Sequence, residues 1–213
     1  MRNFVILFGV ALIMFSCGKE ELEYSCNPEI NAIVKSGVVE FSEIELAEFL
    51  EYDIELQRGI FRSFSADKKR DFWLEKLNSV IASNEFNISE IEHIQKIIDH
   101  ITLDYFAIEI DSVQFRFREE FENEWKAFAK ENLVWDNSKI SYIVNSLCVT
   151  EIQYAQIVIE QEEISLNALG GDCQCSTESD YCIRIGATCG DSGCSVGGAC
   201  GFLLLYDCNG DCM

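Results

Sequence analysis

Cysteine clustering limits the fold of this chain more than any other feature of its sequence. Eight of the eleven cysteines and nine of the thirteen glycines lie after residue 169. A segment this short buries little apolar surface, so covalent links must stabilise it. Its cysteines are Cys173, Cys175, Cys182, Cys189, Cys194, Cys200, Cys208 and Cys212.

An even number of cysteines in an exported chain predicts a disulfide framework, here of four bridges whose pairing the sequence leaves open. Structural zinc is the alternative, and the spacing of Cys208 and Cys212 would suit it. An oxidising compartment favours bridges over zinc. We therefore expect residues 172–213 to form a small disulfide-rich, irregular or β module without a metal ion or other cofactor.

The N-terminus has the pattern of an export signal. A short basic start is followed by an apolar run from Phe4 to Phe15, then by Ser16 and Cys17. The run is shorter than the about 20 residues of a membrane-spanning helix and suits a signal peptide, residues 1–16. Its end resembles a bacterial lipobox, which implies cleavage before Cys17 and a diacylglycerol with an acyl chain such as palmitate on that residue. An ordinary signal peptide with a chance cysteine is the alternative.

Residues 17–26 form an acidic tether. Lys19, Glu20 and Glu21 resemble the export signal of Bacteroidota-type surface lipoproteins. That resemblance implies an outer-membrane lipoprotein, exposed on the cell surface and held to the membrane by its lipid. A solvated linker explains the same charges.

Residues 27–168 are expected to be a helical domain, because this stretch has one proline and almost no glycine. Helix starts are predicted at Asn27-Pro28, Ser42, Ser65, Asn87 and Asn137 or Ser138. Apolar residues at helical spacing predict a bundle of five or six amphipathic helices. The fold class is therefore mainly α, followed by the cysteine-rich module. Cys26 and Cys148 either form an extra bridge from the N-terminal arm to the last helix, or Cys148 is a buried thiol.

Composition excludes several functions. With 37 acidic and 16 basic side chains, the formal charge of −21 argues against nucleic acid as a partner, which requires clustered Lys and Arg. No nucleophile motif is recognisable. His93 and His100 lie seven residues apart, whereas metal-binding histidines on one helix are usually four apart. We therefore predict that the protein is not an enzyme.

A specific motif opens the cysteine-rich segment. Residues 173–182 read C-x-C-S-T-x-S-D-Y-C, and this run resembles the fulvocin C-related bacteriocins. The resemblance implies a non-enzymatic, antibacterial role for residues 172–213, acting on an unidentified envelope or protein target. A double glycine, Gly170-Gly171, resembles a processing site for release of the segment, although a flexible hinge explains it equally well.

The apolar run of this segment is Phe202, Leu203, Leu204, Leu205 and Tyr206. It is either a surface for apolar contact with a target or the buried central strand of the module. Two functions therefore remain open: an antagonism module that kills neighbouring cells, and a surface-anchored binding module without toxicity.

Overall fold

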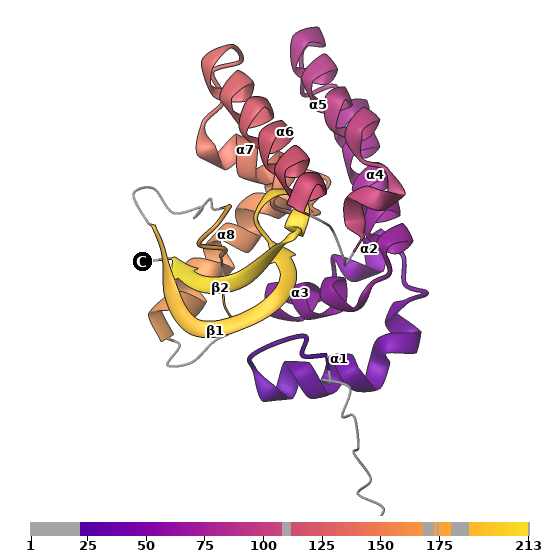
Figure 1. Ribbon diagram of the computed structural model, residues 1–213, viewed down its shortest axis with the longest axis vertical. Coiled ribbons are helices and arrows are strands. Elements are labelled where there is room, and N and C mark those ends of the chain that lie inside the picture. Colours follow the sequence, from indigo (N-terminus) through magenta and orange to yellow (C-terminus); the bar gives the residue numbers. More distant parts are fainter. Residues whose placement is uncertain (1–21, 108–111, 168–172, 174, 180–187, 213) are drawn as a thin grey trace, which may run out of the picture.

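The computed structural model describes residues 22–107, 112–167, 173, 175–179 and 188–212. Most of them are helical, and the chain ends in a two-stranded antiparallel sheet (Figure 1), which confirms the expected fold class. No helix among these residues is long and apolar enough to cross a membrane. The helices are α1 (Pro28–Phe41), α2 (Leu46–Phe49), α3 (Ile54–Ser63), α4 (Ala66–Ala82), α5 (Ile88–His100), α6 (Ser112–Glu131), α7 (Asn137–Val144) and α8 (Glu151–Asn167).

Three predicted helix starts are confirmed, and each is fixed by a local side-chain cap. The Asn27 side chain accepts hydrogen bonds from the first backbone N–H groups of α1, and Pro28 occupies the first helical position. The Ser65 hydroxyl accepts from the N–H of Lys68 in the same way. Asn87 and Glu90 form a reciprocal capping box at the start of α5.

Two predicted starts are wrong. Ser42 follows the end of α1, and its hydroxyl donates to the Val39 carbonyl at 2.7 Å. The last carbonyls of a helix lack hydrogen-bond partners within it. Ser42 therefore caps the C-terminus of α1 and not the N-terminus of the helix after it. Helix α2 then begins at Leu46 without a side-chain cap. Helix α7 is capped by Asp136, one residue before the expected position.

The helices enclose one apolar core. Trp73 and Leu77 of α4 and Ile94 and Ile97 of α5 are completely buried, as their helical spacing predicts. The aromatic face expected on α6 is only partly buried, since Phe117 is 63% exposed. Helix α6 therefore rests on the core through its C-terminal half.

Helices α5 and α6 are joined by a reciprocal pair of hydrogen bonds. The indole N–H of Trp125 donates to the His93 carbonyl at 3.0 Å. The His93 Nε2 lies 3.1 Å from the Trp125 carbonyl, so this nitrogen carries the proton. The two rings stack with centroids 4.5 Å apart. Each residue thereby fixes the other in the core.

The sheet consists of β1 (Cys189–Cys200) and β2 (Tyr206–Cys212). Cys189 lies opposite Cys212, and Cys200 lies opposite Tyr206, with bulges between these ends. The strands are joined through a 3-10 turn, η2 (Phe202–Leu204), in which Leu203 and Leu204 have positive φ. Gly201, at φ +65°, precedes the turn; a Cβ there would lie 2.8 Å from the Tyr206 ring. This site therefore requires glycine.

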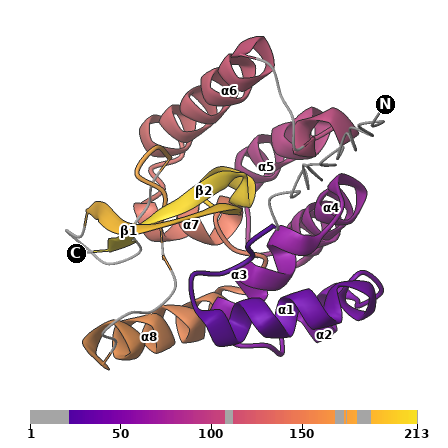
Figure 2. The ribbon, with the colours of Figure 1, turned by 60° about the horizontal axis from the view of Figure 1, so that its bottom comes forward.

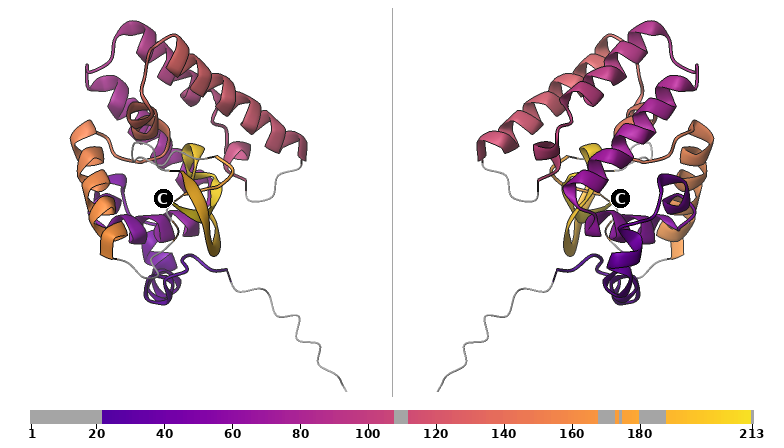
Figure 3. Two further views of the ribbon diagram at one scale, coloured as in Figure 1. Left: turned by 90° about the vertical axis from the view of Figure 1, so that its left-hand side faces the viewer. Right: turned by 90° about the vertical axis from the view of Figure 1, so that its right-hand side faces the viewer.

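The sheet packs beside α3, with α6 on its other side (Figures 1 and 2). The N-terminal arm, residues 22–27, passes the lower edge of the strands in the left view of Figure 3. Phe202 and Leu203 enter the same apolar core as the helices, and the Trp73 indole donates to the Leu203 carbonyl at 3.0 Å. The cysteine-rich segment is therefore integrated with the helices through buried contacts.

Candidate functional site

Two bridges join described residues of the cysteine-rich segment to each other. They join Cys175 to Cys189 and Cys200 to Cys208. Cys212 is also disulfide-bonded, whereas Cys182, like the proposed lipid-bearing Cys17, lies outside the described residues. The expectation of disulfide bonds in this segment is therefore confirmed.

The expectation that all eight cysteines pair with one another is wrong. Cys194 is bridged to Cys26 of the N-terminal arm, and Cys173 is a buried thiol. The Sγ of Cys173 lies 2.8 Å from the Cys208 carbonyl and 3.9 Å from the Sγ of Cys194.

The prediction of an extra bridge between Cys26 and Cys148 is also wrong. Cys148 is a buried thiol, which was the alternative interpretation of this cysteine. The physical reason lies in Arg62 of α3, which directs the arm to the sheet. Its guanidinium donates to the Tyr24 carbonyl at 2.5 Å and to the Gly198 carbonyl at 3.1 Å. These two bonds place the arm beside β1, where Cys26 meets Cys194.

The apolar run as a whole has neither of the expected arrangements, because its first two residues and its last three differ in burial. Phe202 and Leu203 are buried in the core, so they offer no contact surface, and they form a turn instead of a central strand. The left-handed backbone of Leu203 and Leu204 breaks the strand. Leu204, Leu205 and Tyr206 are half-buried.

The remaining faces of these three residues line a pocket of about 290 Å³, near the lower limit for small-molecule sites, about 300 Å³. We call it the junction pocket because arm, helices and cysteine-rich segment all contribute to it. Its lining comprises Leu22, Glu23, Tyr24, Arg62, Lys69, Phe106, Ala107, Phe115, Arg118, Gly197, Gly198, Leu204, Leu205, Tyr206 and Asp207.

Three cations from three helices converge on the junction pocket: Arg62, Lys69 and Arg118. Burial, together with the neighbouring Arg62 charge, lowers the pKa of Lys69 to about 8. The Lys69 ammonium lies 5.4 Å from the centre of the Phe61 ring. Arg118 donates to the carbonyls of Asp104 and Ala107, at 3.2 and 3.4 Å.

Neither Lys69 nor Arg118 forms an ion pair with a carboxylate in the part of the chain that the structure describes. The pocket does contain two carboxylates. Glu23 pairs with Lys35 at 3.1 Å, and Asp207 accepts from the Gly198 N–H at 3.3 Å. The pocket thus has three cationic and two acidic side chains within a strongly acidic protein, and among the described residues two of its cations, Lys69 and Arg118, have no carboxylate ion-paired to them.

A second group of contacts fixes the wall of the pocket. The buried carboxylate of Glu122, on α6, accepts hydrogen bonds from the hydroxyls of Ser179 and Tyr206 and from Lys126. Burial, together with the Glu122 charge, raises the pKa of Tyr206 far above its ordinary value. Tyr206 therefore acts as a neutral donor that positions β2 against α6.

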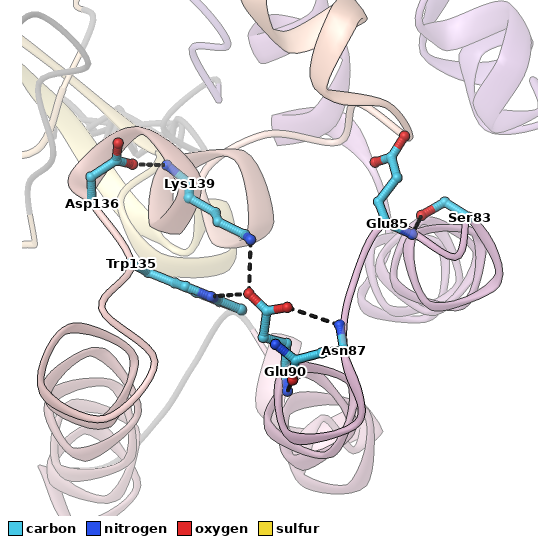
Figure 4. Close-up of polar contacts among 7 residues, drawn as sticks. All are labelled: Ser83, Glu85, Asn87, Glu90, Trp135, Asp136 and Lys139. Carbon is cyan, nitrogen blue, oxygen red and sulfur yellow. Dashed lines mark hydrogen bonds and ion pairs between the residues drawn. The ribbon is translucent and has the colours of Figure 1, made fainter.

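The most complete polar cluster of the helices is structural (Figure 4). One oxygen of Glu90 accepts from the Trp135 indole at 2.7 Å and from Lys139 at 2.8 Å, and the other accepts from the Asn87 N–H at 2.9 Å. Burial alone would raise the pKa of Glu90, but these donors lower it overall. Thus Oε1 of Glu90 ties α5 to Trp135 and α7, whereas Oε2 caps the start of α5.

Sequence inspection missed the junction pocket. Arg62 on α3 and Lys69 on α4 lie near each other in the sequence, with Lys69 inside the run Lys68-Lys69-Arg70, but Arg118 on α6 is far along an acidic chain. The scarcity of basic residues is the one signal in the sequence that draws attention to these cations. It does not predict which of them come together in the folded chain. No protein-family model, curated protein or solved structure matches this chain.

Proposed function

We propose that this protein is an envelope-anchored binding protein whose junction pocket takes a small anion carrying an apolar group. One observation carries the proposal: Arg62, Lys69 and Arg118 meet at an apolar-lined pocket in a chain of net charge −21. The anionic group of the ligand would lie between Lys69 and Arg118. Its apolar part would pack against Phe115 and Leu205.

The environment favours binding of charge. Hydrogen bonds to charged groups are worth about 1.5–3 kcal/mol when solvent is limited, and burial of Lys69 provides that condition. The lowered pKa of Lys69 also supports an anionic ligand, since a nearby negative charge would favour the protonated amine. Carboxylates and alkyl phosphates share the required chemistry.

Binding of octanoate to the full mature chain, measured by calorimetry, tests the proposal. Octanol and octylammonium are the neutral and cationic controls. We expect octanoate to bind at least about tenfold more tightly than either. Equal affinity for all three compounds, or none for octanoate, would contradict the proposal.

Single-residue variants locate the site. Lys69→Met and Arg118→Met should each weaken octanoate binding about tenfold or more, the loss of one charged hydrogen bond. Arg116→Met is the matched control, because Arg116 is an exposed residue of the same helix and does not line the pocket. A loss of affinity in the control as large as in Arg118→Met would place the site elsewhere.

The antibacterial role implied by the bacteriocin-like segment is a second proposal, and the contacts of that segment favour action in place over release. Residues 172–213 would have to break a disulfide and withdraw Phe202 and Leu203 from the core in order to leave. Intact-mass measurement of the protein from its membrane fraction tests this. A lipidated, uncleaved chain agrees with an anchored binding protein, whereas a released segment of residues 172–213 would favour a toxin precursor.

A further inference from the structure

Three sulfur atoms lie together where the N-terminal arm meets β1. The Sγ of Cys194 is bonded to Cys26 on one side and lies 3.9 Å from the buried Sγ of Cys173 on the other. A disulfide bond is about 2.05 Å long, so a shift of about 2 Å would bring Cys173 to bonding distance. Cys173 is completely buried, whereas Cys26 is exposed to solvent.

We propose that Cys173 and Cys26 compete for Cys194 by intramolecular thiol–disulfide exchange. The thiolate of Cys173 attacks the Sγ of Cys194, and a Cys173–Cys194 bond forms as the Cys26–Cys194 bond breaks. The electron pair of the broken bond stays with the sulfur of Cys26, which leaves as a thiolate. Cys26 takes up one proton from solvent, and this balances the proton that Cys173 lost. The number of disulfides is unchanged, so the step needs neither an oxidant nor a reductant.

The positions of the three sulfurs and the exposure of the leaving sulfur favour the exchange once the buried Cys173 thiol loses its proton. The Cys173 thiol donates to the Cys208 carbonyl, which holds its sulfur close to Cys194. Cys26 would leave into solvent, where its thiolate is hydrated. Exposed disulfides are also the more readily exchanged ones. In the product, Cys173 and Cys194 both pair within the cysteine-rich segment.

Exchange would remove the covalent link between the arm and the sheet. Leu22, Glu23 and Tyr24 of the arm form one wall of the junction pocket. Without the bridge, the arm beside the pocket is held by hydrogen bonds and an ion pair alone: the Arg62 bond to the Tyr24 carbonyl, the Glu23–Lys35 pair, and the contacts of Asn31 with Glu23 and Tyr24. The exchange therefore regulates the pocket; this consequence, unlike the exchange itself, rests on the proposed binding function.

Disulfide mapping of the full chain tests the exchange. The protein is equilibrated in a glutathione buffer, quenched with acid, alkylated and mapped by mass spectrometry. We expect wild type to yield both Cys26–Cys194 and Cys173–Cys194 peptides, Cys26→Ser to yield only the second and Cys173→Ser only the first. Cys148→Ser, which removes the other buried thiol, is the matched control and should map as wild type.

Wild type that contains only Cys26–Cys194 under every buffer ratio would overturn the exchange, whether or not the variants fold. Regulation is judged separately, by octanoate affinity. Cys26→Ser should bind octanoate about fivefold more weakly than Cys173→Ser. Without the bridge to Cys194, the arm spends less time in the position in which it forms a wall of the junction pocket. Equal octanoate affinities of the two variants would overturn the regulation of the pocket. The exchange itself would still be judged by the disulfide mapping. Absence of octanoate binding in wild type would contradict the proposed function alone.

Discussion

At the scale of single residues, His93 shows how burial selects a protonation state. Its Nε2–H donates to the Trp125 carbonyl, and its Nδ1 is buried with no hydrogen-bond partner among the described residues. A proton on Nδ1 would place an uncompensated charge in the core. Burial, with a smaller effect of the Lys96 charge, accordingly lowers the pKa of His93 from 6.5 to about 4.

We predict that His93 makes the protein acid-sensitive. Between pH 6.5 and 4 the unfolded chain binds a proton at His93 that the folded chain does not, so stability falls as the pH falls through this window. The loss from this residue is on the order of 2–3 kcal/mol. Urea unfolding at several pH values should show a steeper decline for wild type than for His93→Phe. Parallel curves would show that His93 titrates normally.

Gly210 of β2 illustrates a steric requirement. A Cβ at this position would collide with the sulfur of Cys189 and lie 2.7 Å from the Gly190 carbonyl oxygen, and neither atom belongs to a flexible side chain. The strand thus passes closely over the Cys175–Cys189 bridge.

Gly210→Ala should therefore lower the free energy of unfolding by about 1–3 kcal/mol, the usual cost of overpacking. Gly197→Ala is the control, because a Cβ there would meet no atom closer than 3.6 Å. Thermal unfolding of both variants checks the prediction. Equal melting temperatures for the two would contradict it.

At the scale of elements, Glu122 attaches the cysteine-rich segment to α6. Its carboxylate accepts from Ser179, Tyr206 and Lys126, so its hydrogen-bond partners among the described residues are all donors. An amide at this position would present N–H groups to donors and leave a buried group unsatisfied.

We expect Glu122→Gln to loosen the segment selectively, with a stability loss of about 1–3 kcal/mol. Hydrogen exchange followed by mass spectrometry should show faster exchange in β1 and β2 than in wild type, with α4 little changed. Glu119→Gln, on the exposed side of the same helix, should behave as wild type. Uniformly faster exchange throughout the chain would contradict a local role.

At the scale of the whole molecule, the Cys26–Cys194 bridge closes a loop of 168 residues. Restriction of the unfolded chain by a loop of that length is worth about 5 kcal/mol in the chain-entropy treatment. A Cys173–Cys194 bridge would span 21 residues, and the same treatment gives about 3 kcal/mol. The two bridges therefore differ in their effect on stability by about 2 kcal/mol.

Denaturant unfolding of two variants measures this difference. Cys26→Ser should be less stable than Cys173→Ser by about 2 kcal/mol when the shorter bridge replaces the longer one. A difference near 5 kcal/mol would mean that no replacement bridge forms. The two outcomes are well separated, since unfolding free energies of small proteins are determined to within about 10–15%.

Local features of this fold were predictable, whereas pairings between distant segments were not. Asn27, Ser65 and Asn87 start helices through contacts with residues two or three positions away, so the sequence contains the whole signal. The partner of Cys26 depends instead on Arg62, which binds the arm and β1 together. Phe202 to Tyr206 has the composition of a strand, but its first three residues form a turn and β2 begins only at Tyr206.

The Cys26–Cys194 bridge also determines how the molecule would respond to mechanical load. A pull applied to the N-terminal arm and resisted at the sheet passes through one covalent bond, from residue 26 directly to residue 194. The helices between these positions lie outside that force path and stay relaxed. Exchange to Cys173 would reroute the tension through α1 and the helices behind it, so the same reaction would convert a load-shielded protein into one that can be stretched.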